Sequence, residues 1–145
     1  MSTLIDIRTK LLELVSSTNS PVFRMSLDIV DYLSNNPNKR DLSLIGLRNQ
    51  LQVTPEYDAA IFQASLVLSN YPYEVLDIKY NLVDEDLSEV IQTLDAATYT
   101  KALSAGFFID DDGEALSLVE MNSRMFPYFV NRHSSLYELT KTESS

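Results

Sequence analysis

The chain contains no cysteine, which excludes a disulfide framework, a thiolate zinc site and a cysteine nucleophile. Glycine is also scarce, with three residues, at Gly46, Gly106 and Gly113. This spacing excludes the glycine-rich loops that hold phosphates and the G-x-S-x-G turn that presents a catalytic serine. Few glycines, together with only five prolines, also disfavour an all-β or loop-rich fold.

Long apolar runs are absent as well. No stretch approaches the roughly 20 residues that a membrane-spanning helix needs. The first ten residues include Asp6, Arg8 and Lys10, whereas a signal peptide has an uninterrupted apolar stretch after its basic start. We therefore expect a cytoplasmic protein, or a nuclear one in a eukaryote, with no membrane segment.

Histidine occurs once, at His133, without a companion at metal-ligand spacing, so we expect it to be a surface or capping residue. The acidic run Asp110–Glu114 does not have the spacing of a calcium loop, because Gly113 comes too early and Met121 stands where the final glutamate is needed. We expect no metal, no cofactor and no catalytic residues. An enzyme remains an alternative only if carboxylates or tyrosines distant in sequence meet in space.

Basic residues are scarce in the middle of the chain. Of a net charge of −10, residues 59–123 contribute two basic and twelve acidic side chains. Phosphate backbones are repelled by such a segment, so nucleic-acid binding through this half is disfavoured. A surface that serves only to keep the protein in solution is the alternative interpretation of the same charge.

What is present favours helices. Apolar residues recur at three- and four-residue spacing, and Ser20-Pro21 and Thr54-Pro55 are typical helix starts. Strict alternation from Leu76 to Leu82 predicts a strand, and Asp112-Gly113 predicts a β-hairpin. The expected elements are helices over 3–16, 21–34, 44–51 and 55–69, a strand over 76–82, helices over 84–94 and 96–105, and a hairpin over 107–119.

These elements predict a mainly α protein with a small antiparallel β component, an α+β fold. We expect one compact domain over residues 1–139. It is divided into N-terminal helices (1–53), a winged-helix-like part (54–119) and a C-terminal aromatic and helical segment (120–139). Residues 140–145 are expected to form a flexible tail.

The order helix, strand, helix, turn, helix, hairpin over residues 54–119 is that of a winged helix-turn-helix. A DNA-reading member of that class places its second paired helix in the major groove and its hairpin on the backbone. Here the second helix offers one cation, Lys101, and the hairpin turn offers only carboxylates. We therefore expect this part to contact protein rather than DNA.

The leading hypothesis is a non-enzymatic protein–protein interaction module, an accessory or adaptor subunit whose partner has a basic surface. Homo-oligomerisation is compatible with it. Aromatic side chains dominate interface hot spots, although the same residues would also suit a core. The candidate partner-binding residues are Asp110, Asp111, Asp112, Glu114, Phe126, Tyr128 and Phe129, with Tyr137 close by.

Two alternatives use charge differently. A DNA-binding regulator of winged helix-turn-helix type would bind through a basic patch of Lys39, Arg40 and Arg48. An acidic mimic of nucleic acid would present the carboxylates of Asp84–Glu89 together with those of Asp110–Glu114. Mimicry needs charges spaced regularly along a surface, whereas these gather at two turns.

Overall fold

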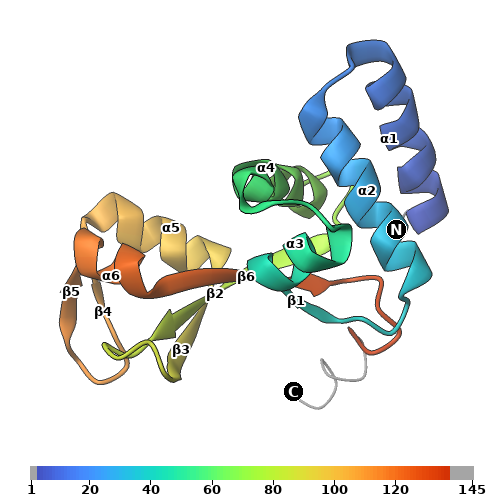
Figure 1. Ribbon diagram of the computed structural model, residues 1–145. Coiled ribbons are helices and arrows are strands. Elements are labelled where there is room, and N and C mark those ends of the chain that lie inside the picture. The colour runs from blue at the N-terminus through green and yellow to red at the C-terminus, as the bar shows by residue number, and fades with distance from the viewer. Residues whose placement is uncertain (1–2, 138–145) are drawn as a thin grey trace. The chain divides into compact units, whose positions relative to one another are not determined.

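The computed structural model describes residues 3–137, and the chain divides into two units that are described separately. Unit 1 comprises Met1–Asp77 and Phe129–Ser145, and unit 2 comprises Ile78–Tyr128. These boundaries do not coincide with the sequence-based divisions at residues 53 and 119. The predicted tail, 140–145, lies outside the described residues. The α+β fold class is confirmed (Figure 1).

Unit 1 begins with two helices that pack against each other, α1 (Leu4–Thr18) and α2 (Pro21–Asn35). The Thr3 and Ser20 side chains accept backbone N–H groups at the two helix starts, which satisfies donors that have no partner within a helix. Every fourth residue of α1 is buried, at Ile7, Leu11 and Val15. Both predicted helices are thus confirmed.

Two further helices complete the helical layer of unit 1. Strand β1 (Asp41–Ser43) leads directly into α3 (Leu44–Leu51), whose N-cap is Ser43. A single 3-10 turn, η1 (Pro55–Tyr57), then precedes α4 (Asp58–Ser69), which packs on α2 and α3. The predicted helix from Thr54-Pro55 is therefore present, but its first turn is tighter than an α-helix.

The main sheet has four antiparallel strands in the order β1-β6-β2-β3. Its remaining strands are β2 (Leu76–Val83), β3 (Val90–Asp95) and β6 (Met125–Asn131). The end of β6 is bonded to the segment before β1, because the Asn131 N–H donates to the Arg40 carbonyl at 2.7 Å. The Arg132 N–H donates to the Val75 carbonyl at 2.9 Å. These bonds join residues far apart in sequence within unit 1.

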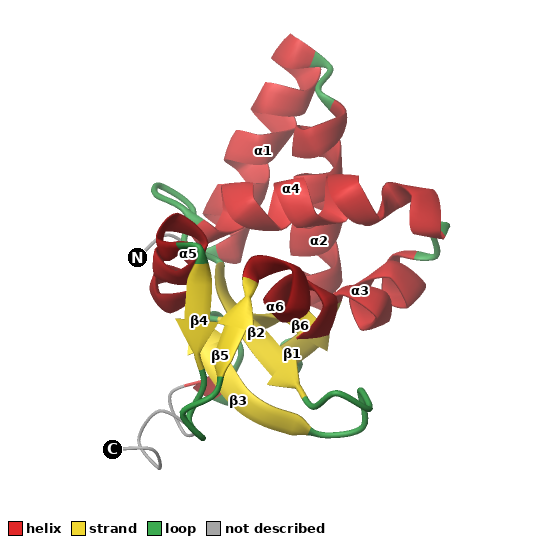
Figure 2. Cartoon of the chain, turned by 90° about the vertical axis from the view of Figure 1, so that its left-hand side faces the viewer, coloured by secondary structure: helices red, strands yellow, loops and turns green. Residues whose placement is uncertain are grey.

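Unit 2 adds α5 (Ala96–Ala105), β4 (Phe107–Ile109), β5 (Ala115–Ser117) and α6 (Leu118–Arg124). The predicted α5 is confirmed, with Asp95 as N-cap and Gly106 at φ 87° after its last turn. The predicted hairpin is confirmed as β4 paired with β5, shown side by side in Figure 2. No described helix is both long enough and apolar enough to cross a membrane.

The predicted helix over 84–94 is wrong. Its apolar residues Leu87, Val90, Ile91 and Leu94 have helical spacing, but Val90–Asp95 form strand β3 against β2. β-branched residues favour a strand here, and the Thr93 hydroxyl donates to the Asn81 side chain across the pair at 2.9 Å. The helix pair on which the winged-helix interpretation of 54–119 depended is therefore not formed.

Candidate protein-contact surfaces

The turn of the β4–β5 hairpin is organised around Asp110. This side chain is only 6% exposed, and its Oδ1 accepts the N–H groups of Asp112 at 3.0 Å and Glu114 at 2.9 Å. Gly113 takes φ 85°, which completes the turn at a backbone geometry that favours glycine. Asp110 was predicted as a partner-binding residue in a solvated turn. The prediction is wrong for this residue, because its carboxylate holds the turn together.

The other carboxylates of the turn, Asp111, Asp112 and Glu114, are exposed. The Asp111 N–H donates to the side-chain oxygen of Gln92 at 3.0 Å, which ties the turn to β3 within unit 2. These three acids remain candidates for partner binding. Their charge is not offset locally, since unit 2 as a whole carries three basic and ten acidic side chains, a net charge of −7.

An apolar face of the same hairpin was not predicted. Cross-strand pairing places Phe107 opposite Ser117 and Ile109 opposite Ala115, and all four residues are exposed. The alternate residues, including the buried Leu116, point to the opposite face. Phe107 is 49% exposed and Ile109 is 56% exposed. Alternation along the strands predicts which residues share a face of the hairpin. It does not predict which of the two faces is covered by other parts of the protein.

The fold buries some residues of the predicted aromatic anchor and exposes others. Phe129 is completely buried and belongs to the core, so it is wrong as an exposed anchor. Phe126 is 49% exposed, whereas Tyr128 and Tyr137 are half-buried. The segment forms β6, in which Phe126 and Phe129 lie on opposite faces of the sheet, and its last three residues, 129–131, are all buried. Phe126 alone remains as an exposed aromatic ring of the set.

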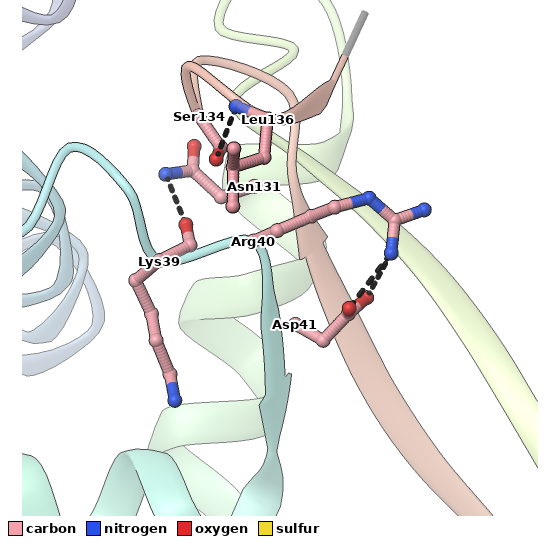
Figure 3. A network of polar contacts seen from close by, with 6 residues as sticks. All are labelled: Lys39, Arg40, Asp41, Asn131, Ser134 and Leu136. Atoms are coloured by element: carbon pink, nitrogen blue, oxygen red, sulfur yellow. Dashed lines mark hydrogen bonds and ion pairs between the residues drawn. The ribbon is translucent and has the colours of Figure 1, made fainter. Parts of the chain in front are cut away.

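The predicted basic patch is largely neutralised by neighbouring acids. The Arg40 guanidinium binds both carboxylate oxygens of Asp41, at 2.8 and 2.7 Å (Figure 3). The Arg48 guanidinium lies 2.8 Å from Asp58 Oδ2. Lys39 contributes its carbonyl to the fold, accepting the Asn131 side-chain N–H at 3.0 Å (Figure 3). Two of the three cations proposed for DNA binding are thus engaged within unit 1.

Helix α4 presents an uncharged face that the sequence reasoning missed. Its exposed residues Ala59, Gln63 and Leu66 lie on one side of the helix, and half-buried Phe62 borders them. No charged residue occurs between Asp58 and Glu74. The signal was present in the sequence as an uninterrupted uncharged run, and its significance depends on knowing which side of α4 faces outward.

Two carboxylates, Asp84 and Asp95, have lowered pKa values because they accept local hydrogen bonds. Hydrogen bonds from Ser88, chiefly its backbone N–H, lower the pKa of Asp84 and close the turn between β2 and β3. Hydrogen bonds from the Thr98 hydroxyl and N–H lower the pKa of Asp95, the N-cap of α5. Both shifts reflect local caps and turns.

Two further groups have pKa values that are shifted chiefly by burial. Burial, followed by the nearby Arg132 cation, lowers the pKa of His133, and its Nε2 is buried without a hydrogen-bond partner in the described part of the chain. Burial, followed by the neighbouring Tyr99, raises the pKa of Tyr80, and the two rings lie 4.2 Å apart. Within residues 3–137, no three acidic or histidine side chains are grouped as a metal site.

Comparison with family models, with curated proteins and with solved structures finds no match to this chain.

Proposed function

We propose that the chain is a non-enzymatic protein-interaction module and that the helices α2, α3 and α4 of unit 1 supply a winged-helix-like contact surface. The winged-helix order is helix, short strand, helix, helix and then two strands. Six elements of the chain match this order, namely α2, β1, α3, α4, β2 and β6. In the sheet, β6 lies between β1 and β2. This order is the one expected for residues 54–119, but it begins at Pro21 and receives residues 84–124 between its last two strands.

The uncharged face of α4 carries the proposal. In a DNA-reading helix-turn-helix, the helix after the turn enters the major groove, where Arg, Lys, Asn and Gln read the bases. Helix α4 follows α3 in this position and offers Gln63 beside Ala59 and Leu66. It has no cation for phosphate, and beyond its first residue, Asp58, the helix carries no charge. Such a face suits burial against another protein, because no charge must be desolvated.

The ion pairs of the predicted basic patch support the same proposal. Binding to phosphate would require Arg40 and Arg48 to leave Asp41 and Asp58, which would then be unpaired carboxylates close to a polyanion. The net charge of −10 opposes nucleic-acid binding at longer range. A DNA-binding regulator is therefore not favoured by the contacts that these residues make.

Site-specific photo-crosslinking tests the proposal. A photoreactive amino acid at position 63 of α4 is expected to form discrete protein crosslinks in cells of the source organism. The matched control is position 13, occupied by the exposed Glu13 of α1 in the same unit. Equal crosslinking from both positions, or crosslinks only to nucleic acid, would refute the proposed contact.

A DNA titration completes the test. Fluorescence anisotropy with a mixed-sequence duplex at low salt is expected to show no saturable binding. Any cation-mediated binding must weaken as salt rises, with a slope near −0.9 per phosphate neutralised. Binding with that dependence would favour the DNA-binding regulator instead.

A further inference from the structure

We propose that the outer face of the β4–β5 hairpin in unit 2 is a docking site for a segment of another protein that combines apolar side chains with Lys or Arg. The inference extends the proposed function to a second surface and states the chemistry of its partner. It depends on three observations about the hairpin: its exposed apolar face, the step between its two strands, and the carboxylates of its turn.

The apolar face is continuous along β4. Phe107 and Ile109 stand two residues apart on the same side of the strand, and each exposes about half of its surface. Exposed apolar residues scattered singly need no explanation, whereas these two are adjacent on one sheet face and form a continuous apolar patch. The opposite face carries the half-buried Phe108 and the buried Leu116, and both strands contact α6.

The two strands differ in side-chain size. Large residues on β4 are paired with small ones on β5, because Phe107 faces Ser117 and Ile109 faces Ala115. The face therefore has a raised apolar edge beside a lower strip. A partner side chain can lie over the small residues and contact the large ones from the side, which gives more buried area than a flat face.

The turn at the end of this face is negatively charged, and this charge favours a positively charged partner. The carboxylates of Asp111, Asp112 and Glu114 are exposed there, while Asp110 is buried and holds the backbone. A partner segment that extends from the apolar face past the turn meets three negative charges. Lys or Arg at that end of the segment is attracted, and Asp or Glu is repelled.

A second copy of this chain fits the face poorly. Unit 2 has a net charge of −7, so two such faces brought together would place like charges near one another. Nucleic acid is excluded by the same sign of charge. The occupant that satisfies both the apolar face and the acidic turn is therefore a basic, partly apolar segment of a different protein.

Selection from a random-peptide phage library against the full-length protein tests this inference. We expect enriched peptides to combine apolar residues with an excess of Lys and Arg. Synthetic versions should lose on the order of tenfold or more in affinity for Ile109→Thr, a substitution that keeps a strand-forming residue. The matched control is Ile5→Thr, at an exposed isoleucine of α1 in unit 1, which should bind as the parent protein does.

Two further measurements make the outcome decisive. Amide chemical shifts of the parent protein should change on peptide binding mainly within residues 107–117. Asp111→Asn with Asp112→Asn should slow association and flatten its salt dependence. The inference is overturned if no peptide is enriched, if enriched peptides are neutral or acidic, or if Ile109→Thr binds as tightly as Ile5→Thr. It is also overturned if the parent protein self-associates and the Ile109→Thr variant does not. None of these outcomes depends on α4, so the proposed function is tested separately.

Discussion

The Arg48 guanidinium lies 2.8 Å from Oδ2 of Asp58, so an ion pair joins α3 to the first residue of α4. Both side chains are mostly covered, at 18% and 32% exposure. The other oxygen of Asp58, Oδ1, is buried and has no hydrogen-bond partner in the described part of the chain. The carboxylate therefore depends on Arg48 for most of its compensation.

Replacing Arg48 with Met should destabilise the protein by about 1–2 kcal/mol, because a partly buried carboxylate loses its cation. Urea denaturation monitored by circular dichroism measures the change in unfolding free energy. The matched control is Arg8→Met, which breaks the pair of Arg8 with Asp31 at 2.6 Å, where exposure is 47% and 40%. That exposed pair should contribute less than about 0.5 kcal/mol. Equal losses in the two variants would contradict the stabilising role assigned to Arg48.

The Asp110 carboxylate gives a second prediction. Asp110→Ala removes the acceptor of the Asp112 and Glu114 N–H groups and should cost about 1–2 kcal/mol of unfolding free energy. Asp110→Asn keeps an oxygen at the same place and should cost less. Thermal denaturation of both, with Asp111→Ala as the exposed control, measures this difference. A loss in Asp111→Ala as large as in Asp110→Ala would show that the turn depends on its charge and not on these two bonds.

Local signals predicted the elements whose ends are encoded by nearby residues. Asp95 and Gly106 bound α5 because one side chain caps the first turn and the other residue adopts a left-handed conformation. Asp112-Gly113 located the hairpin for the same kind of reason. The role of Asp110 was also encoded locally, since aspartate readily bonds to the backbone two residues on.

Distant pairing was not predictable in this way. Leu87, Val90, Ile91 and Leu94 satisfy a helical pattern, and only pairing with β2 makes Val90–Asp95 a strand. Pro127 disfavoured a strand in the segment that forms β6, because proline lacks the N–H that a ladder uses. That strand is fixed by contacts far along the sequence, as between Asn131 and Lys39. The exposed hairpin and α4 faces depend on such packing, so the sequence did not locate them.

Phe129 and Phe126 differ in burial, and this gives a third prediction. Phe129→Ala should cost about 3–5 kcal/mol of unfolding free energy, because it removes a fully buried ring and leaves a cavity. Phe126→Ala, at 49% exposure, should cost about 1 kcal/mol or less. Chemical denaturation of both variants measures the difference. Similar losses would place Phe126 in the core, and a minor loss for Phe129→Ala would restore that ring as a contact residue.

The half-buried His133, whose Nε2 atom is buried, predicts a specific pH dependence of stability. Burial and the Arg132 cation lower its pKa in the folded protein below the ordinary value of 6.5. The unfolded chain therefore binds a proton at a higher pH than the folded protein does, and protonation favours unfolding. Stability from this residue is complete above about pH 6.5 and is lost as pH falls from there through the folded-state pKa.

Measuring unfolding free energy in urea between about pH 7 and pH 5, for the parent and His133→Gln, isolates this contribution. The parent should lose stability on acidification in this window, and His133→Gln should lose less because glutamine does not titrate. Asp84 and Asp95 do not interfere, since their pKa values lie below the ordinary carboxylate value of 3.8 and their contribution is lost only at lower pH. Parallel losses in the two proteins would show that His133 does not carry the dependence. A gain on acidification that is present in the parent and absent in His133→Gln would mean that folded His133 binds the proton more tightly than the unfolded chain does, opposite to the direction expected here.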